Sequence, residues 1–265
     1  MRTTFLSTIS ALVLIVAASV GRVHSAEDDG GYVAEKNGRS PAEMAAARAK
    51  IPPVAVALPG DRLQRLPKTR QRLREGGSLR IVMLGDSIIN DTARGCWHEL
   101  VAKHYPKCAI VCYTCVRGGT GCWFYKQPGK VQKYVLAQRP DLVIVGGISQ
   151  RHDVDSIRDC LQQIRAKSSC EFFLMTGPFG VADPLSGADW RKKIADGKDE
   201  KYAAALAALA GEFAAEYLDL QTVWGDYIRG AGKPLDFFKR DPVHANAEGE
   251  AALARILEQY FAPAK

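Results

Sequence analysis

Short apolar runs, each closed by glycine, recur along the middle of the chain. They are Leu79–Leu84 before Gly85, Ala109–Val116 before Arg117-Gly118-Gly119, Asp141–Val145 before Gly146, and Glu171–Met175 before Thr176-Gly177. Each run is almost continuously apolar and too short for a helix, which is typical of a strand buried on both faces. The pattern therefore predicts four parallel strands that end in glycine turns.

Segments with helical periodicity separate these runs. They cover Thr92–His104, Gly129–Ala137, Val154–Lys167 and Glu200–Ala215, and a final one covers Ala247–Tyr260. A fifth short strand is expected at Glu216–Leu220. Because strands alternate with helices, we expect a three-layer α/β/α sandwich around a five-stranded, mainly parallel sheet with right-handed crossovers. Ligands of such sheets bind outside the carboxyl ends of the strands, where the glycine turns lie.

The first 25 residues have the pattern of an export signal. Arg2 precedes an apolar run from Phe5 to Val20, and Val23-His24-Ser25 offers a cleavage site before Ala26. A membrane anchor is the alternative, but this run is short for a span and contains serine and threonine. We expect an exported protein, periplasmic or extracellular, with no stable membrane span in the mature chain.

The rest of the chain divides into a linker and one domain. Residues 26–60 are rich in alanine, glycine, proline and charge, and we interpret them as a flexible linker with at most one short helix near Pro41–Lys50. Residues 61–265 are the expected domain, with an N-terminal helix over 62–75 and a core over 79–261. A chain of 265 residues, 47% hydrophobic and 25% charged, is long enough to bury such a core.

Charge and cysteine content narrow the classes of partner. The formal charge is +7, and a basic segment runs from Arg62 to Arg80. The segment has neither interleaved aromatics nor zinc-finger spacing, so we expect no nucleic-acid partner. The chain has seven cysteines, for which export favours structural disulfides or buried thiols. We expect no metal, because Cys112-Tyr-Thr-Cys115 lacks the second CxxC pair of a zinc ribbon.

Gly85-Asp86-Ser87 is the sharpest candidate for chemistry. It directly follows the first strand, so the turn would raise the Ser87 hydroxyl above the sheet edge. Backbone N–H groups that a helix start leaves unpaired would lie beside it. A serine in this position can attack an acyl carbon, although an aspartate or serine before a helix is also an ordinary cap.

A base for such a serine stands near the other end of the chain. Asp241-Pro-Val-His244 comes just before the final helix, and in a bent segment residues three apart can face each other. The Asp241 carboxylate would then orient the His244 ring and stabilise its protonated form. The alternative is a helix-entry turn in which Asp241 and Asn246 act only as caps.

With both end motifs in place, the chain resembles the SGNH, or GDSL-type, hydrolase family over about Leu79–Phe261. The resemblance implies a flavodoxin-like sandwich, with Ser87 as nucleophile, His244 as general base and then acid, and Asp241 as orienting carboxylate. It implies a carboxylic ester hydrolase that forms an acyl-serine and needs no cofactor. The Ser87 N–H would be one donor of the oxyanion hole.

The remaining donors of the family's oxyanion hole match less well. The second block implies Gly119, with Gly118 as the neighbouring alternative, although a plain turn glycine is also possible. The third block is usually Gly-x-Asn-Asp, and here it is Gly146-Gly147-Ile148-Ser149-Gln150. Ser149 stands at the Asn position if Gly147 is aligned, and Gln150 supplies the nearest amide. Losing one such donor typically lowers the rate by about 10²–10³.

Three further features near these blocks bear on the substrate site. Trp123-Phe124-Tyr125 follows the second block and forms either an aromatic wall against a sugar ring or part of the core. His152 follows the third block, at the mouth of the site or in a solvated loop. The connection from Gly177 to Lys198 is long and leaves a strand end, so we expect it to border the substrate cleft.

Export and the resemblance together favour a carbohydrate O-acetyl esterase that acts on a small or glycan-linked ester. A lipase, lysophospholipase or thioesterase of the same fold is the alternative enzyme. A different class, a non-catalytic glycan-binding domain that kept the fold, is motivated by the missing Asn of the third block. A nucleotide-binding domain is disfavoured, since the glycine-rich turns match neither phosphate-binding pattern.

Overall fold

The computed structural model describes residues 24–25, 29–35, 38–178, 183–187, 190 and 198–263. Its strands form one sheet in the order β1-β2-β4-β3-β5-β6-β7. The strands are β1 (His24–Ser25), β2 (Tyr32–Glu35), β3 (Gly77–Gly85), β4 (Cys108–Val116), β5 (Leu142–Val145), β6 (Glu171–Met175) and β7 (Glu216–Leu218). The five strands from β3 to β7 are parallel, which confirms the predicted parallel strands, and the antiparallel β1 and β2 extend the sheet to seven strands where five were predicted.

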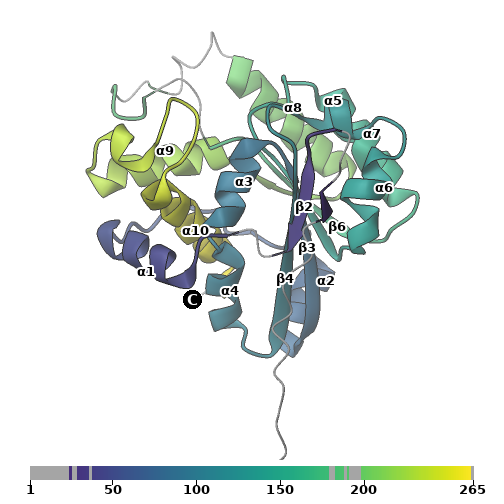
Figure 1. The fold of residues 1–265 in the computed structure, drawn as a ribbon, viewed down its shortest axis with the longest axis horizontal. Coiled ribbons are helices and arrows are strands. Elements are labelled where there is room, and N and C mark those ends of the chain that lie inside the picture. Colours follow the sequence, from purple (N-terminus) through teal and green to yellow (C-terminus); the bar gives the residue numbers. More distant parts are fainter. Residues whose placement is uncertain are drawn as a thin grey trace, which may run out of the picture.

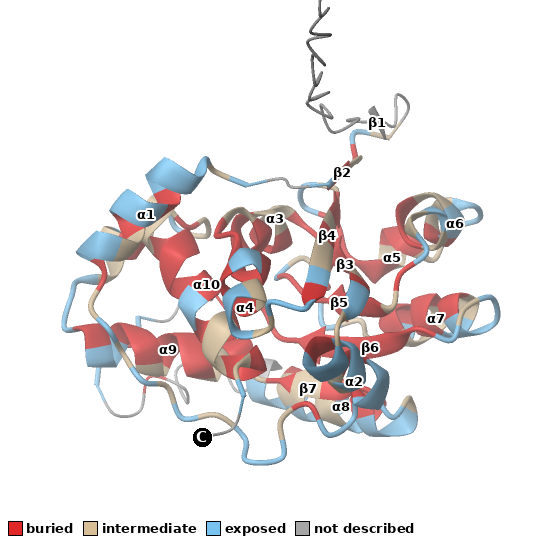
Figure 2. Ribbon diagram, turned by 90° about the horizontal axis from the view of Figure 1, so that it is seen from below, coloured by how far each residue is buried: buried red, intermediate tan, exposed pale blue. Residues whose placement is uncertain are grey.

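The helices cover both faces of the sheet (Figure 1). They are α1 (Pro41–Lys50), α2 (Pro67–Glu75), α3 (Ser87–Arg94), α4 (Trp97–His104), α5 (Cys122–Tyr125), α6 (Lys130–Tyr134), α7 (Val154–Arg165), α8 (Lys198–Glu212), α9 (Leu220–Ala231) and α10 (Ala247–Phe261), with short 3₁₀ turns η1 (Leu136–Gln138) and η3 (Leu235–Phe238). Figure 2 shows the buried residues concentrated on the sheet and on the inner sides of these helices.

The alternation of side chains along the central strand divides the core in two. Ile81 and Met83 of β3 belong to the cluster beneath α1, α3, α4, α9 and α10, whereas Val82 and Leu84 belong to the cluster beneath α5 to α8. All four side chains are buried. This is why the central runs are apolar at every position: each face of a parallel sheet covered on both sides needs its own apolar row.

The helix predicted over Thr92–His104 is instead two helices, α3 and α4. A Cβ on Gly95 would lie 2.2 Å from the carbonyl oxygen of Glu250, so only glycine allows α10 to pass this close. Cys96, which follows, has a φ of 55° and turns the chain between the two helices. The break thus comes from a tertiary contact with α10.

Three other helix boundaries differ from the sequence prediction. The helix expected over 62–75 begins only at Pro67, since Leu63 has a φ of 64°. The period at Gly129–Ala137 is divided between α6 and η1. The sequence prediction missed α9, because the strand expected to run to Leu220 ends at Leu218 and Asp219 caps a new helix.

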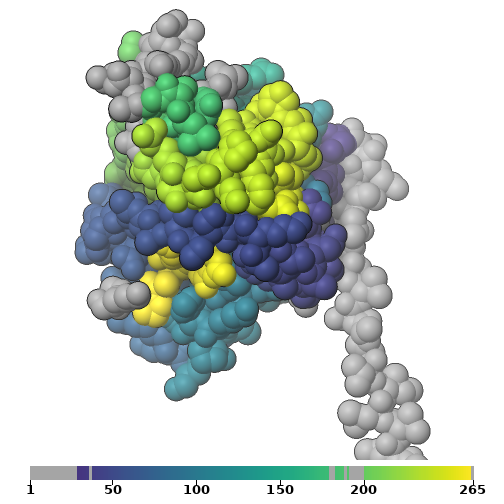
Figure 3. Space-filling view, turned by 90° about the vertical axis from the view of Figure 1, so that its left-hand side faces the viewer, coloured from purple at the N-terminus to yellow at the C-terminus, as the bar shows by residue number. Residues whose placement is uncertain are grey.

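Part of the predicted linker packs onto the domain, which corrects that interpretation. β2 pairs antiparallel with β4, with Tyr32 opposite Val116. The expected helix is present as α1, and its residues Met44 and Ala47 are buried with α10 in the core. The chain then continues as a band across this face of the molecule (Figure 3). The apolar positions of α1 explain the packing.

The predicted export signal lies mostly outside the described residues. Residues 1–23 are not described, and His24–Ser25 pairs with β2 as a two-residue strand. Within the described part of the chain, no helix combines the length and apolar character needed to cross a bilayer.

Candidate active site

The candidate nucleophile is the first residue of α3, directly above the end of β3. The end of β3 passes very close to the neighbouring strand end. A Cβ on Gly85 would lie 2.6 Å from the carbonyl oxygen of Gly146, so this position requires glycine. Asp86 is the N-cap and accepts from the N–H groups of Ile88 and Ile89. Ser87 is half-buried at the helix start, where the N–H groups of the first turn have no partner within the helix.

The structure brings Ser87, His244 and Asp241 together across 157 residues of sequence. His244 Nε2 lies 2.9 Å from Ser87 Oγ. The other ring nitrogen, Nδ1, lies 2.8 Å from Asp241 Oδ2. An N–H at Nδ1 is therefore held by the carboxylate, which leaves Nε2 to accept the serine proton.

Asp241 is fixed in its ionised form by its own loop. Its Oδ1 accepts from the N–H groups of Val243 and His244, each at 2.9 Å. The hydrogen bond from Val243, joined by those from His244 and opposed by burial, lowers the pKa of Asp241 to about 2. The carboxylate loses its charge only as the pH falls through that value, so it stays ionised wherever His244 can act as a base.

Asp86 joins the nucleophile turn to the third-block loop. Its buried carboxylate accepts from the N–H groups of Ile148 and Ser149 at 2.8 and 2.7 Å, in addition to its bonds within α3. Gly147 has a φ of 98°, and a Cβ there would lie 2.3 Å from Asp86 Oδ1. The loop closes over this carboxylate only because residue 147 is glycine.

Asp91, four residues after Ser87 on α3, holds the histidine loop. Its buried Oδ2 accepts from Ala245 N–H at 3.0 Å, and its Oδ1 lies 3.1 Å from the guanidinium of Arg240. Burial raises the pKa of Asp91, and the charge of Arg240 opposes that rise. The helix that carries the nucleophile thus also anchors both residues flanking Asp241–His244.

A second buried carboxylate extends this support. Glu250 of α10 is fully buried and forms an ion pair with Arg39, while Arg94 of α3 lies 3.5 Å from it. Burial raises the pKa of Glu250, and the hydrogen bond from Arg39 opposes that rise. Sequence analysis missed this network of Asp91, Arg240, Glu250 and Arg39, although Arg240 stands directly before Asp241 and Asp91 lies one helical turn after Ser87.

Gly118 and Gly119 lie in the turn after β4, beside the nucleophile strand. Arg117 N–H donates to the carbonyl oxygen of Gly85 at 3.2 Å, which holds the start of this turn against the end of β3. Gly119 has a φ of 63°, and no atom of the described residues lies within 4 Å of a Cβ built on it. The backbone of the second block is therefore next to the serine turn with open space above it.

The two third-block candidates have different surroundings. Gln150 is buried, with Oε1 accepting from Cys122 N–H and Nε2 donating to the carbonyl oxygen of Gly146, both at 2.9 Å. Its amide therefore holds the loop, in place of the oxyanion role suggested by sequence. Ser149 is half-buried, and within the described part of the chain its hydroxyl has no hydrogen-bond partner. Ser149 is the better candidate for a third donor.

The aromatic triplet divides between core and surface. Phe124 and Tyr125 are buried, and the Tyr125 hydroxyl donates to the carbonyl oxygen of Gly85 at 2.6 Å. Trp123 is half-buried, donates to the Ser149 carbonyl oxygen at 3.0 Å, and has the guanidinium of Arg151 over its ring at 3.9 Å. Only Trp123 is therefore available to a substrate beside the third block.

His152 and the long connection complete the predicted surroundings. His152 is exposed, with its ring centroid 5.1 Å from that of Tyr202. In the connection from Gly177 to Lys198, residues 179–182, 188–189 and 191–197 lie outside the described residues. The expectation that this segment borders the cleft therefore stays a prediction.

All seven cysteines are buried and unpaired. The sequence left structural disulfides and buried thiols as alternatives. The structure shows buried thiols, and no disulfide joins these seven cysteines. Burial raises the pKa of Cys96 to about 11 and that of Cys112 to about 12, so both remain protonated thiols at neutral pH. Among the described residues, no group of three His, Cys, Asp or Glu side chains is placed to hold a metal ion.

Several solved structures share the fold at low sequence identity. A two-domain esterase active on acetylated mannans, co-crystallised with mannopentaose, has a TM-score of 0.55 and 18% identity over 75% of this chain. This chain spans 52% of that protein, about half its length. Axe2, an acetylxylan esterase from Geobacillus stearothermophilus, has a TM-score of 0.55 and 17% identity over 72% of this chain and 99% of its own.

A third structure, the acetyl xylan esterase AlAXEase, has a TM-score of 0.50 and 17% identity, covering 66% of this chain and 96% of its own. At the sequence level, no family model and no curated protein matches the chain. At these identities the likeness establishes the fold, and the reactive groups have to be judged from the geometry of this chain.

The geometry predicts how activity depends on pH. Because Nε2 of His244 must be unprotonated to accept the Ser87 proton, kcat/KM for an acetyl ester measured from about pH 5 to 8 should be lower at the acid end, where a protonated ring cannot take that proton. Asp241 contributes nothing to this limb, since its pKa is about 2. A stopped or continuous ester assay across this range measures it, and a flat profile would contradict His244 as the base.

The anchoring role of Asp91 gives a second prediction. Asp91→Ala removes the acceptor of Ala245 N–H and of Arg240, so His244 loses its fixed position while the reacting groups remain. We expect kcat to fall by about 10²-fold with little change in KM, and the free energy of unfolding to fall by about 1–3 kcal/mol.

The matched control is Asp155→Ala, which removes an exposed carboxylate of α7. Kinetics and thermal unfolding of both variants supply the comparison. A folded Asp91→Ala protein with the kcat of the wild type would show that Asp91 does not position the histidine.

Proposed function

We propose that the protein is an exported serine esterase of the SGNH type that removes acetyl groups from polysaccharides or their oligosaccharides. The observation that carries the proposal is the 2.9 Å contact between Ser87 Oγ and His244 Nε2, with Asp241 on the far side of the ring. A nucleophile, its base and an orienting carboxylate in this arrangement fit acyl transfer.

In the proposed reaction, Ser87 Oγ attacks the carbonyl carbon of the ester while its proton passes to His244 Nε2. The oxyanion of the tetrahedral intermediate accepts from the N–H groups of Ser87 and Gly119, with the Ser149 hydroxyl as the third donor. The carbon–oxygen bond to the alcohol then breaks, and the proton on His244 goes to the departing alkoxide oxygen.

The second half of the reaction returns the enzyme to its starting state. Water attacks the acyl-serine and gives one proton to His244 Nε2, and collapse of the second intermediate releases the carboxylic acid as the proton returns to Ser87 Oγ. Each step uses only side chains and backbone groups of this chain. No cofactor enters the cycle.

The choice of a carbohydrate acetyl ester rests on two lines of support. The structural neighbours described above act on acetylated mannan or xylan, and structures of Axe2 include catalytic mutants with a serine or a histidine replaced by alanine. In this chain, Trp123 lies half-buried beside the third block, where an indole can stack on a sugar ring. The proposal that the protein is exported rests on the signal-like pattern of residues 1–25.

The experiment compares acyl donors and a nucleophile variant. The wild type should release acetate from acetylated xylo- or manno-oligosaccharides and should hydrolyse p-nitrophenyl acetate faster than the octanoate. Ser87→Ala should lower kcat by about 10³-fold or more. Ser78→Ala, an exposed serine of β3, is the control and should keep full activity.

Three outcomes separate the candidate functions. Faster turnover of the octanoate would favour a lipase or thioesterase and reject the acetyl specificity. Absence of turnover for every acyl length, with retained binding of the oligosaccharide, would favour a glycan-binding domain. Unchanged turnover in Ser87→Ala would reject the serine mechanism itself.

A further inference from the structure

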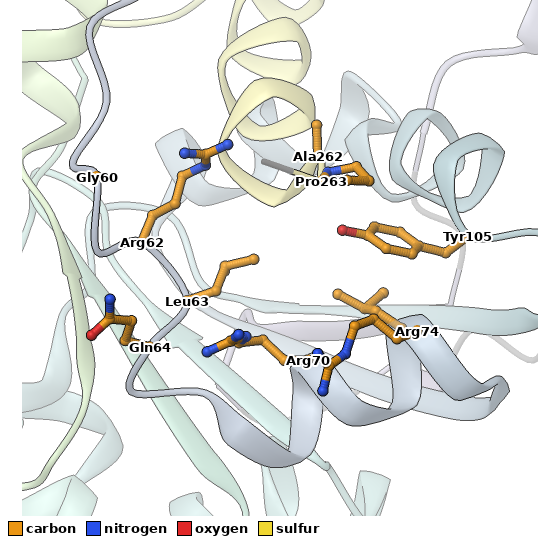
Figure 4. A pocket seen from close by; sticks show the side chains of 10 residues that line it. Gly60, Arg62, Leu63, Gln64, Arg70, Arg74, Tyr105, Ala262 and Pro263 are labelled. Carbon is orange, nitrogen blue, oxygen red and sulfur yellow. The ribbon is translucent and has the colours of Figure 1, made fainter. Parts of the chain in front are cut away.

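A separate cavity of about 450 Å³ lies between α2, the end of α4 and the end of α10 (Figure 4). Its lining includes Arg62, Arg70 and Arg74, the side chains of Leu63 and Leu73, and the ring of Tyr105. Its volume lies within the range of small-molecule sites. Several of its lining residues belong to the basic segment of residues 62–80, and this segment has no role in the proposed function.

The cavity lies far from the reacting groups. β3 runs from Gly77, just after α2, to Gly85, just before Ser87, and in Figure 1 α2 lies at the lower end of β3 and β4. Nine residues of strand span roughly 26 Å at the usual rise per residue. A molecule bound at α2 would therefore not touch the Ser87 hydroxyl.

Among the described residues that line it, positive charge without a counter-charge distinguishes this cavity. Arg62 lines it from the loop, with its guanidinium turned toward α10, and Arg70 and Arg74 line it along the side formed by α2 (Figure 4). Among the described lining residues none is acidic. Within the described part of the chain, the guanidinium groups of Arg70 and Arg74 have no ion-pair or hydrogen-bond partner, and Arg62 only donates from Nε to the Tyr260 carbonyl oxygen at 3.1 Å.

Of the four other basic residues of the segment, three have side-chain partners, and Arg65 is exposed with none among the described residues. Arg72 pairs with Asp141 at 3.0 Å, and Arg80 donates to the carbonyl oxygen of Gln138. Lys68 donates to the carbonyl oxygen of Ser169. Within one short stretch, three of the four basic side chains outside the cavity bond to protein acceptors, and the three that line it keep unused donors.

Apart from Gln64, the remaining walls are mainly apolar. Leu63 and Leu73 are buried, and Pro263 forms part of the opposite side. The Tyr105 hydroxyl donates to the Phe261 carbonyl oxygen at 2.7 Å, which fixes the ring against the cavity. Burial raises the pKa of Tyr105, and the positive charges of Arg62, Arg70 and Arg74 oppose that rise.

We propose that this cavity binds a small organic anion, in which a carboxylate or phosphate group is attached to a compact body about the size of a monosaccharide. The guanidinium groups match the paired oxygens of either anionic group, since each presents several N–H donors in one plane. The body of the ligand packs against Leu63, Leu73 and the Tyr105 ring. This site is distant from Ser87, and it binds the ligand without reacting with it.

Calorimetric titration of the purified protein at about 0.15 M salt tests this, since such salt screens long-range attraction. The probes are glucose 6-phosphate, glucuronate, inorganic phosphate and neutral glucose. We expect saturable binding of glucose 6-phosphate or glucuronate with a Kd of about 1 mM or below, and the probe that binds identifies the anionic group. Glucose should not bind.

Variants locate the binding. Arg70→Gln and Arg74→Gln should each raise the Kd about tenfold, as expected for loss of a hydrogen bond to a charged group. Arg65→Gln removes the same charge from an exposed residue outside the cavity and should leave the Kd within about twofold. Hydrolysis of p-nitrophenyl acetate should be unchanged in all three variants.

Each contrary result overturns the proposal. No saturable binding of either organic anion would reject the site. Equal affinity for inorganic phosphate and glucose 6-phosphate would show that the apolar walls take no part. Equal weakening by Arg65→Gln would show that the general basic charge of the segment, and not the cavity, attracts the ligand.

Discussion

The hydrogen bond between Ser87 Oγ and His244 Nε2 joins two ends of the chain, and α3 has contacts that anchor both. The serine begins this helix, and Asp91 on the next turn holds the histidine loop through Ala245 N–H and Arg240. Asp86, before the serine, holds the third-block loop in the same way. One short helix therefore sets the relative positions of nucleophile, base and neighbouring loop.

This arrangement places two carboxylates, Asp91 and Glu250, in the buried interior. Burial raises the pKa of both Asp91 and Glu250, against the attraction of their arginine partners. A raised pKa in the folded state means that these groups favour folding below their unfolded pKa, and that this contribution is lost as the pH rises through the folded value. At neutral pH their ionised forms carry this cost of burial, while removing either carboxylate would leave its buried partners unpaired, and we infer that their role is to position the histidine loop.

The five parallel strands and the two end segments of the candidate site could be predicted from the sequence. Short, continuous apolar runs closed by glycine fit few structures other than buried parallel strands. The predicted strand before Ser87 and the predicted helix after His244 lie close to their observed bounds. What the sequence missed depends on tertiary contacts. β2 is a strand because β4 offers an open edge, and the helix break at Gly95 reflects the close passage of α10. The support from Asp91 and Arg240 is likewise visible only when segments distant in sequence meet.

The most direct test of the central claim is covalent trapping of an activated serine. The protein is incubated with a fluorophosphonate, and mass spectrometry of the digested protein locates the adduct. The account predicts one adduct, on Ser87, and its loss in His244→Ala, because only a serine whose proton is taken by the imidazole reacts at a useful rate. An unlabelled wild-type protein, or Ser87 labelled equally well without His244, would contradict it.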